Sequence, residues 1–367
     1  MTFFKKYLLP GFVFQSVVIG GGYGTGRELV EFFLTQGPAG GYFGMMVALC
    51  IWSVVMAVTF ELARVGRHYD YRSFLNDLLG KGWLVYEIVY VAGLIIVISV
   101  IGSAASELLR DMFALPPTLG SILMMVLVGF FVFKGSALIE KALSAWSFAL
   151  YAVYVAVIVV TWHAFGDKIK ATAVMHIEGS QWFFGGVKYA AYNIGIVPAV
   201  LFATRHIERR KEAFAAGALA GVIAMLPGVL IYTAMLSQYP EVISEAVPAN
   251  FLLAKLGFPV FQLIFQLILF GTFVETGIGI IHGFNERIAG IYQDRNAEMP
   301  PALRLSLALL IMTVAIYLAG AIGLVALIAK GYGTLTWGYW LVYLLPVMTV
   351  GVWRIFRPRR PSQGCNE

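Results

Sequence analysis

One acidic residue inside an apolar stretch has the clearest chemical potential in this sequence. Glu275 lies in the segment LILFGTFVETGIGIIHGF, with the hydroxyls of Thr272 and Thr276 within a helical turn of it. A carboxylate in a low-dielectric environment must bind a cation or take up a proton. The segment therefore predicts a site of ion or proton coupling, against the alternative that Glu275 only bonds to a neighbouring helix.

Two further ionisable residues follow on the same stretch. His282 and Glu286 come after Glu275 at helical intervals, so the three side chains share one helix face. This face is interpreted either as a proton route that includes His282 or as the solvated end of the helix.

Charges also flank two glycine-containing segments elsewhere in the chain. Arg27 and Glu28 follow the first of them, and Lys188 precedes the centre of the second. Opposed charges above a central site predict an outer gate, for example between Glu28 and Lys188. Static ion pairs, or a lysine that extends toward the headgroups, explain these residues equally well.

The first glycine-containing segment predicts an interrupted helix. It reads GFVFQSVVIGGGYGTGRELVEFF, and Gly20, Gly21 and Gly22 are consecutive. A small-residue packing face would instead place glycines every four residues. Each glycine costs a helix about 1 kcal/mol relative to alanine. Unwound backbone at membrane depth persists only where it lines a cavity or binds something.

The second segment, QWFFGGVKYAAYNIGIVPAVLFAT, has the features of a matching interruption. Tyr192, Asn193 and Gly195 lie at its centre, and Pro198 lacks the N–H for a helical hydrogen bond. A simple proline kink would explain this segment alone. Interruptions at corresponding places of two halves instead indicate the substrate site of a secondary transporter. Free N–H groups suit a carboxylate and unwound carbonyls suit Na⁺ or an ammonium, a combination that fits an amino acid.

The surrounding elements are those of a membrane protein. The 367 residues are 60% hydrophobic and 13% charged, whereas soluble domains carry about 25% charged residues. The two cysteines, Cys50 and Cys365, exclude a disulfide framework or a cysteine metal cluster. Because a spanning helix needs about 20 apolar residues, we predict about ten transmembrane helices, near residues 9–34, 39–64, 83–110, 117–134, 141–164, 181–204, 213–237, 259–285, 302–328 and 334–355.

The predicted fold class is therefore an all-α membrane protein built as a five-plus-five inverted repeat, with discontinuous helices 1 and 6. Residues 1–366 form a single transmembrane domain, whose halves are 8–164 and 180–356. Short helices that do not span are expected at 71–79 and 246–256.

The distribution of basic residues sets the expected orientation. With the N-terminus placed in the cytoplasm, most Lys and Arg residues fall on the inner side, as the positive-inside rule requires. The net charge of +6 is thereby explained without a nucleic-acid partner. We expect an integral plasma (inner) membrane protein with both termini cytoplasmic, whose partners are the lipid bilayer and a small molecule; the oligomeric state is left open. The basic residues that fall outside are Arg110, Lys168, Lys170, Lys255 and Lys330.

Three motifs carry a resemblance to a known family. They are GGGYGTGRE at 20–28, KYAAYNIGIVPAVL at 188–201 and VETGIGIIHGFNERI at 274–288. With them the chain resembles the amino acid–polyamine–cation (APC) superfamily of the leucine-transporter fold, and is similar within it to the YkvI-like amino acid permeases. The resemblance implies a substrate between helices 1 and 6, completed by helices 3 and 8. The implied substrate residues are Gly20, Gly21, Gly22, Tyr23, Gly24, Thr25, Ser99, Ser103, Tyr189, Tyr192, Asn193 and Gly195.

The resemblance also implies an ion site. Sodium-coupled relatives use the backbone of the first break and hydroxyls of helix 8, and these positions fall here on Gly20, Glu275 and Thr276. Thr272 and His282 join them from the residue pattern above. The carboxylate departs from the family pattern, so Na⁺ and H⁺ both stay open as the coupling ion. No other cofactor is expected.

Rival functions differ in what they require. A channel predicts a pore ring from several subunits, and a membrane enzyme needs a catalytic dyad or histidine pair that the apolar segments lack, so no catalytic or metal site is expected. A solute sensor on a transporter scaffold stays open as an alternative. We expect a secondary active symporter, coupled to an ion or a proton, that carries an amino acid or a related compound by alternating access. Trp337, Tyr339 and Trp340 are interpreted as anchors at the membrane interface.

Overall fold

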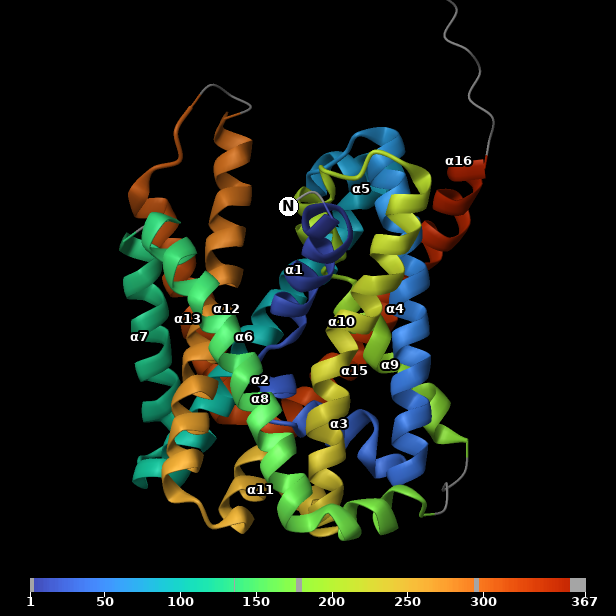
Figure 1. Cartoon of the computed structure of the whole chain (residues 1–367). Helices are drawn as coiled ribbons and strands as arrows, with labels where there is room; N and C mark the ends of the chain where they lie inside the picture. The colour runs from blue at the N-terminus through green and yellow to red at the C-terminus, as the bar shows by residue number, and fades with distance from the viewer. Residues whose placement is uncertain (1–2, 135, 176–179, 294–296, 357–367) are drawn as a thin grey trace, which may run out of the picture.

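The computed structural model describes residues 3–134, 136–175, 180–293 and 297–356, which are almost entirely helical (Figure 1). Short 3₁₀ and π-helical segments connect the longer helices, and η1 (Phe4–Leu8), η4 (Val197–Thr204), η6 (Glu241–Ser244) and η7 (Leu327–Tyr332) bear on the site. The α-helices are α1 (Leu9–Val18), α2 (Gly21–Gly24), α3 (Arg27–Phe32), α4 (Pro38–Gly66), α5 (Tyr71–Leu79), α6 (Trp83–Phe113), α7 (Pro117–Lys134), α8 (Ser136–Ala173), α9 (Gln181–Ile194), α10 (Arg210–Met235), α11 (Pro248–Leu256), α12 (Pro259–Gln293), α13 (Pro301–Ile322), α14 (Leu324–Ala326), α15 (Gly333–Tyr339) and α16 (Val352–Phe356).

Apolar helical stretches make this an integral membrane protein. Within the described residues, seven stretches are long and apolar enough to cross a bilayer, by length and composition. The expected spans 9–34 and 181–204 are not among them, because the first is interrupted after Val18 and the second passes from α9 into the 3₁₀ helix η4. The predicted break of helix 6 is therefore a change of helix type, with Gly195 and Ile196 still at right-handed helical angles. The apolar part of α7, Thr118–Val132, is short. The count of ten spans and the inverted repeat stay predictions. The seven stretches are Pro38–Gly66, Tyr71–Phe113, Ala149–Ala173, Arg210–Gln238, Pro259–Ala289, Pro301–Ile322 and Leu324–Phe356.

Both predicted short helices are present, and their nine residues each are too few to cross a bilayer on their own. α5 occupies the expected range, and α11 begins two residues later than expected, at Pro248. α5 begins where it does because the Asp70 side chain accepts a hydrogen bond from the Ser73 backbone N–H, at 2.8 Å, and so caps the helix.

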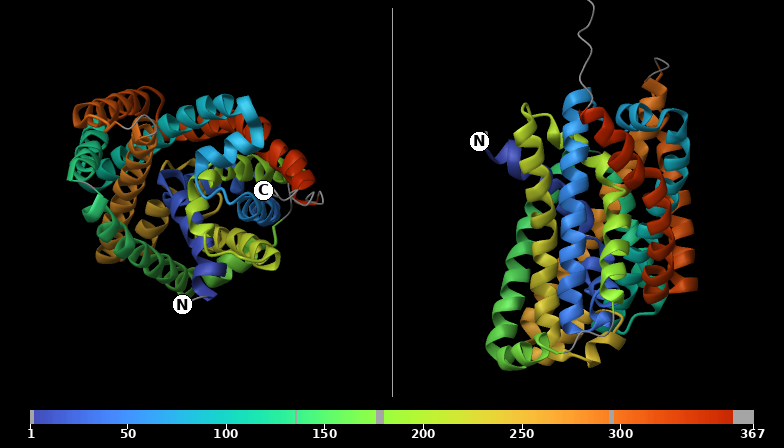
Figure 2. Two further views of the ribbon diagram at one scale, coloured as in Figure 1. Left: turned by 90° about the horizontal axis from the view of Figure 1, so that it is seen from above. Right: turned by 90° about the vertical axis from the view of Figure 1, so that its right-hand side faces the viewer.

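The helices form two groups that face each other. α1, α4, α9 and α10 pack together, and α6, α7, α12 and α13 pack together on the other side. α8 contacts both α10 and α12, and α15 contacts both α9 and α6. Seen from above in Figure 2, the blue α4 and yellow α10 lie on one side, and the orange α12 and α13 with the green α7 lie on the other. The interrupted first segment runs between the two groups.

Glycines bring α4 and α10 into backbone contact. A Cβ atom built at Gly217 would overlap the backbone of Ala57. One built at Gly221 would lie 2.9 Å from the backbone nitrogen of Ser53 and 3.0 Å from the carbonyl oxygen of Leu49. In a membrane this close approach replaces the hydrophobic effect as the source of packing energy.

Ion pairs join the start of the chain to the start of α10. Lys6 Nζ lies 2.9 Å from a Glu208 carboxylate oxygen and 3.1 Å from one of Glu212. The hydrogen bond to Glu208, followed by that to Glu212, raises the pKa of Lys6. The first segment is thereby fixed to the α4–α10 group on the side of the termini.

We predict that Gly217→Ala destabilises the protein, because the added methyl group must push α4 and α10 apart; overpacking of this kind costs about 1–3 kcal/mol. Gly333→Ala is the matched control, since Gly333 is helical and a Cβ there would meet no atom within 4 Å. Thermal unfolding of the purified variants in one detergent should show a lower Tm for Gly217→Ala alone. Equal Tm values would contradict the packing described here.

Candidate functional site

The first segment is interrupted near its middle. α1 ends at Val18, Ile19 leaves the helical region with φ −75° and ψ 81°, and Gly20 is extended. The chain then resumes as the short helix α2. It turns again at Gly26, whose φ of 80° lies in the left-handed region that favours glycine, before α3 begins. Glycines are therefore required here for two changes of backbone direction within one segment.

The second segment changes helix type instead of unwinding. α9 ends at Ile194, Gly195 and Ile196 keep right-handed helical angles, and the chain continues as the 3₁₀ helix η4. The Tyr86 phenol donates a hydrogen bond to the Gly195 carbonyl, and the ring of Tyr339 lies directly against Gly195. The carbonyl released by the change of helix type is thus bonded to a side chain of α6.

A cavity of about 390 Å³ lies beside the first interruption, between the two helix groups. Its wall is mostly apolar, and Glu28 and Glu275 supply two carboxyl groups. None of the described lining residues is a lysine or an arginine. One end of the cavity includes Phe202 and Gly283, which are exposed. The lining comes from α1, α3, α6, α9, η4, α12, η7 and α15.

Three of the predicted substrate residues line this cavity: Gly20, Tyr192 and Asn193. Asn193 is held by a 3.0 Å hydrogen bond from its side-chain amide to the Tyr189 carbonyl. Tyr189 itself is fully buried, and its ring packs edge-on against that of Phe33 with centroids 4.7 Å apart. Its phenol has no hydrogen-bond partner among the described residues.

The other predicted substrate residues of the first segment make structural contacts outside the cavity. Gly21 faces the Ile101 backbone of α6, and Gly24 faces Leu269 of α12. Gly22 lies under a side chain of its own segment, as described below. The Tyr23 phenol donates to the Ala224 carbonyl of α10 at 3.1 Å.

Thr25 and the predicted residues of α6 are also bonded elsewhere. The Thr25 hydroxyl donates to the Gly22 carbonyl at 2.9 Å, while its own carbonyl accepts from Ala249 of α11. Ser99 donates to the Ile95 carbonyl of its own helix at 2.7 Å. Ser99 and Ser103 are buried, and the cavity meets α6 closer to its N-terminal end, around Gly93 and Val97.

The predicted ion-coupling residues lie where the interruption at Gly20 meets α12. A Cβ at Gly20 would lie 3.7 Å from the Thr276 methyl group, and Glu275 and His282 line the cavity with Thr276. The hydroxyls of Thr276 and Thr272 donate to carbonyls one turn back, at 3.0 and 2.9 Å. Their lone pairs stay available for a cation. The Glu286 side chain lies outside the described residues.

The three predicted gate residues are not brought together. Arg27 is buried and donates hydrogen bonds to the carbonyls of Ile243 and Glu245, at 2.7 and 3.1 Å, while pairing with Glu31 at 3.0 Å. Lys188 is exposed on α9. Glu28 turns inward to accept a hydrogen bond from the Tyr192 phenol. Arg27 therefore joins the first segment to η6 and the residue after it, at the end of the protein away from the termini.

Several cavity residues carried no clear sequence signal. Tyr90 and Tyr332 line the cavity, and so does Tyr339, which is buried. The interpretation of Tyr339 as an interface anchor is therefore wrong. The glycines of KGYGTLTWGY resemble those of the first segment in spacing, and this was the one available sign that helix 10 approaches a neighbour closely.

The chain is a membrane protein with the leucine-transporter fold, as its likeness to solved structures shows. No family model matches the chain. It is 25% identical over 279 residues to the uncharacterized membrane protein YkvI of Bacillus subtilis, a match that covers 76% of this chain and 79% of that one. The predicted resemblance to the YkvI-like proteins is thereby confirmed.

Solved structures with different cargoes share the fold. MhsT in complex with L-phenylalanine aligns with a TM-score of 0.60 at 12% identity, covering 95% of this chain and 96% of that chain. A Na⁺-coupled sialic acid symporter aligns with a TM-score of 0.61 at 12% identity, covering 93% of this chain and 78% of that chain. A variant of the Eremococcus coleocola manganese transporter aligns with a TM-score of 0.58 at 12% identity, covering 94% of this chain and 78% of that chain. No group of three or more His, Cys, Asp or Glu suited to a metal ion occurs in the part of this chain that the structure describes.

We predict that Arg27→Ala lowers the Tm, because it removes charged hydrogen bonds worth about 1.5–3 kcal/mol each and leaves two loop carbonyls without their donor. It should also raise the labelling rate of a cysteine introduced at Glu245, as η6 separates from α3. Arg205→Ala is the control, since Arg205 is exposed. An unchanged Tm and labelling rate in Arg27→Ala would show that this contact does not hold the end closed.

Proposed function

We propose that this protein is a secondary active transporter that carries an amino acid or a related small solute by alternating access. The observation that supports it most is the cavity at the interruption of the first segment, between two separately packed helix groups. Irregular backbone at membrane depth is costly unless it borders such a cavity. A volume of about 390 Å³ also falls in the range of small-molecule sites.

The unequal closure of the two ends of the cavity supports alternating access. Toward the termini the cavity reaches exposed residues. At the other end, Arg27 binds the carbonyls of η6, and the Ala249 N–H of α11 donates to Thr25 at 2.9 Å. With both termini in the cytoplasm, as the positive-inside pattern favours, this arrangement is an inward-facing state.

An amino acid-like solute and a coupled cation agree with the chemistry of the cavity. Two carboxyl groups in a mostly apolar wall without a described lysine or arginine favour a solute or ion with positive charge. The backbone at Gly20, together with Thr272, Glu275 and Thr276, supplies oxygen atoms of the kind that bind Na⁺, and the carboxyl of Glu275 alone suits a proton. Either ion would couple transport to a gradient.

We predict that Glu275→Gln abolishes gradient-driven uptake, because the amide can neither carry a proton nor neutralise a cation. Substrates would first be chosen by a thermal-shift screen of the purified protein against amino acids and cations, since ligands of the folded state raise the Tm. Uptake into proteoliposomes should then fall to a tenth of wild type or less (~10-fold), while counterflow exchange persists.

Glu241→Gln is the control for this variant, because Glu241 lies at the surface in η6. Wild-type accumulation by Glu275→Gln would contradict the coupling role. Binding of a solute to the wild-type protein without any accumulation would instead identify a sensor on a transporter scaffold.

A further inference from the structure

The carboxyl group of Glu28 occupies an unusual position, on the wall of the cavity and against the interrupted backbone. Glu28 belongs to α3, yet its side chain turns back over α2. A Cβ built at Gly22 would lie 2.6 Å from Glu28 Cγ and 2.7 Å from Cδ. Only a glycine at position 22 leaves room for the carboxyl group there. The third consecutive glycine of the segment therefore provides the space that the Glu28 carboxyl group occupies.

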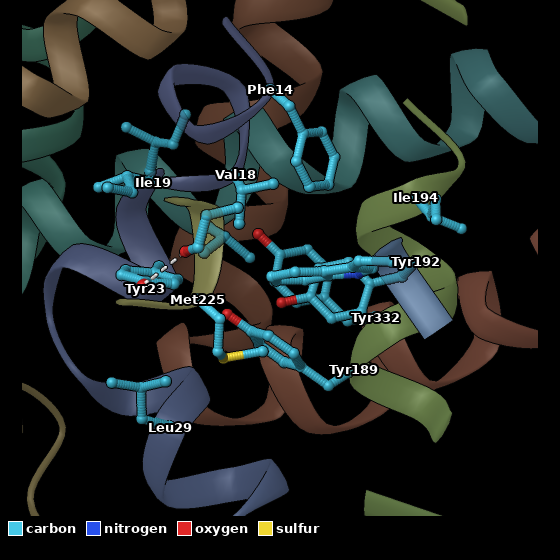
Figure 3. Packing of buried hydrophobic residues seen from close by; sticks show 14 of the residues in the cluster. Phe14, Val18, Ile19, Tyr23, Leu29, Tyr189, Tyr192, Ile194, Met225 and Tyr332 are labelled. Carbon is cyan, nitrogen blue, oxygen red and sulfur yellow. Dashed lines mark hydrogen bonds between the residues drawn. The ribbon is translucent and has the colours of Figure 1, made fainter. Parts of the chain in front are cut away.

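A set of aromatic rings fixes this carboxyl group in place. The Tyr192 phenol donates a hydrogen bond to Glu28, and its ring stacks on Tyr332 with centroids 4.5 Å apart. Tyr189 meets Tyr192 edge-on at 5.6 Å, and its buried phenol has no partner among the described residues. Figure 3 shows these three rings gathered beside the first segment. Glu28 is only 3% exposed, and it still contributes to the cavity wall.

The groups around Glu28 do not neutralise it. Arg27, its neighbour in sequence, is directed to η6 and Glu31, and no described residue forms an ion pair with Glu28. The other charged residue of the wall near the interruption is Glu275, an acid, and His282 lines the wall from α12. The titratable side chains that interact with Glu28 are phenols from α2, α8, α9 and η7, which are neutral at physiological pH: Tyr23, Tyr154, Tyr189, Tyr192 and Tyr332.

A buried carboxyl group without a fixed positive partner must be neutralised by a species that can bind and dissociate. Two positive species can reach Glu28 through the cavity: a proton from water and the charged part of a solute. An ammonium group fits beside it, because the phenol oxygens accept hydrogen bonds and aromatic faces attract cations.

We propose that Glu28 is the group that recognises the ammonium of the solute, and that it holds a proton while the cavity is empty. When the ammonium enters, the carboxyl O–H bond breaks, the proton passes to water, and a carboxylate–ammonium ion pair forms. One positive charge replaces another, so the interior of the protein stays neutral throughout. This assignment rests on the proposed function, in which the cavity binds an amino acid-like solute.

This exchange of a proton for an ammonium group predicts how the affinity for the solute depends on pH. Binding releases one proton, so affinity for an ammonium rises with pH, by about tenfold per unit, for as long as empty Glu28 is protonated. It levels off once Glu28 is ionised in the empty protein. The amine itself stays charged up to about pH 10. A solute held only by its carboxylate would show no such rise.

Three probes with one apolar skeleton separate the charged groups: leucine, isopentylamine, which lacks the carboxylate, and isocaproate, which lacks the ammonium. With the purified full-length protein, we expect leucine and isopentylamine to raise the Tm and isocaproate to leave it unchanged. Calorimetry should show isopentylamine affinity rising about tenfold per pH unit at acidic pH. Glu28→Gln should lose this pH dependence and at least about tenfold in affinity. Equal binding of isocaproate, or an unchanged pH dependence in Glu28→Gln, overturns the proposal.

Two further variants separate this role from a merely structural one. Tyr192→Phe removes the same hydrogen bond but keeps the carboxyl group, so it should keep the pH dependence that Glu28→Gln loses. Glu107→Gln removes a carboxyl at the far end of α6, where it pairs with Arg110, and should behave as wild type. Loss of the pH dependence in Tyr192→Phe and Glu28→Gln alike would assign Glu28 to structure only and overturn the proposal.

Infrared difference spectroscopy tests the protonation of Glu28 without any ligand. At neutral pH the wild-type protein should show stronger carbonyl absorption from protonated carboxylic acids than Glu28→Gln, because any contribution of Glu275 is common to both. Equal absorption in the two proteins overturns the proposal. Leucine uptake into proteoliposomes tests the proposed transport function separately from the role of Glu28. If the three probes bind as expected but leucine is not taken up, the Glu28 assignment is supported and the transport function is contradicted. If leucine is taken up but amine binding does not depend on pH, only the Glu28 assignment is contradicted.

Discussion

The requirement that every polar group at membrane depth has a partner governs this structure. Hydrocarbon offers no hydrogen bonds, so the backbone released at Ile19 and Gly20 and the carboxyl groups nearby must find partners within the protein or in its cargo. Local contacts meet part of this requirement. Thr25 bonds to Gly22, the Gly195 carbonyl accepts from Tyr86, and Arg27 binds the loop carbonyls of η6. Glu28, whose carboxyl group accepts a hydrogen bond from Tyr192 and forms no ion pair among the described residues, is the group for which we propose an exchangeable partner.

The division into two helix groups follows from the same requirement. Apolar surfaces gain little from association in lipid, so a helix pair needs close backbone contact to pack firmly. Gly217 and Gly221 supply this contact between α4 and α10. On the other side of the first segment, Gly21 lies against the Ile101 backbone of α6, and Arg27 holds the end away from the termini through the carbonyls of Ile243 and Glu245. The α4–α10 pair is therefore one firmly packed unit on one side of the cavity.

Much of this architecture could be predicted from the sequence, and particular residues show where prediction stops. Consecutive glycines at 20–22 located the first interruption, and the short helices at 71–79 and 248–256 were recognisable from their composition. The change of α9 into a 3₁₀ helix was not predictable, because Gly195 and Pro198 are compatible with a kink, a break or a tighter helix. The inward turn of Glu28 was also missed. Periodicity places a residue on a helix face, but the fold of a chain back over its own break depends on tertiary contacts. Tyr339 was misjudged for a related reason, since aromatic residues near the end of a span resemble interface anchors until a neighbouring helix covers them.

The ion pairs of Lys6 have a mechanical consequence. Because they attach η1 to the start of α10, and α10 is packed against α4 through glycines, any displacement of η1 is resisted by the whole α4–α10 pair. The Lys6–Glu208 pair is exposed, whereas the Lys6–Glu212 pair is partly buried. Exposed ion pairs weaken as salt rises, so ionic strength on that side of the protein would set how firmly η1 is held.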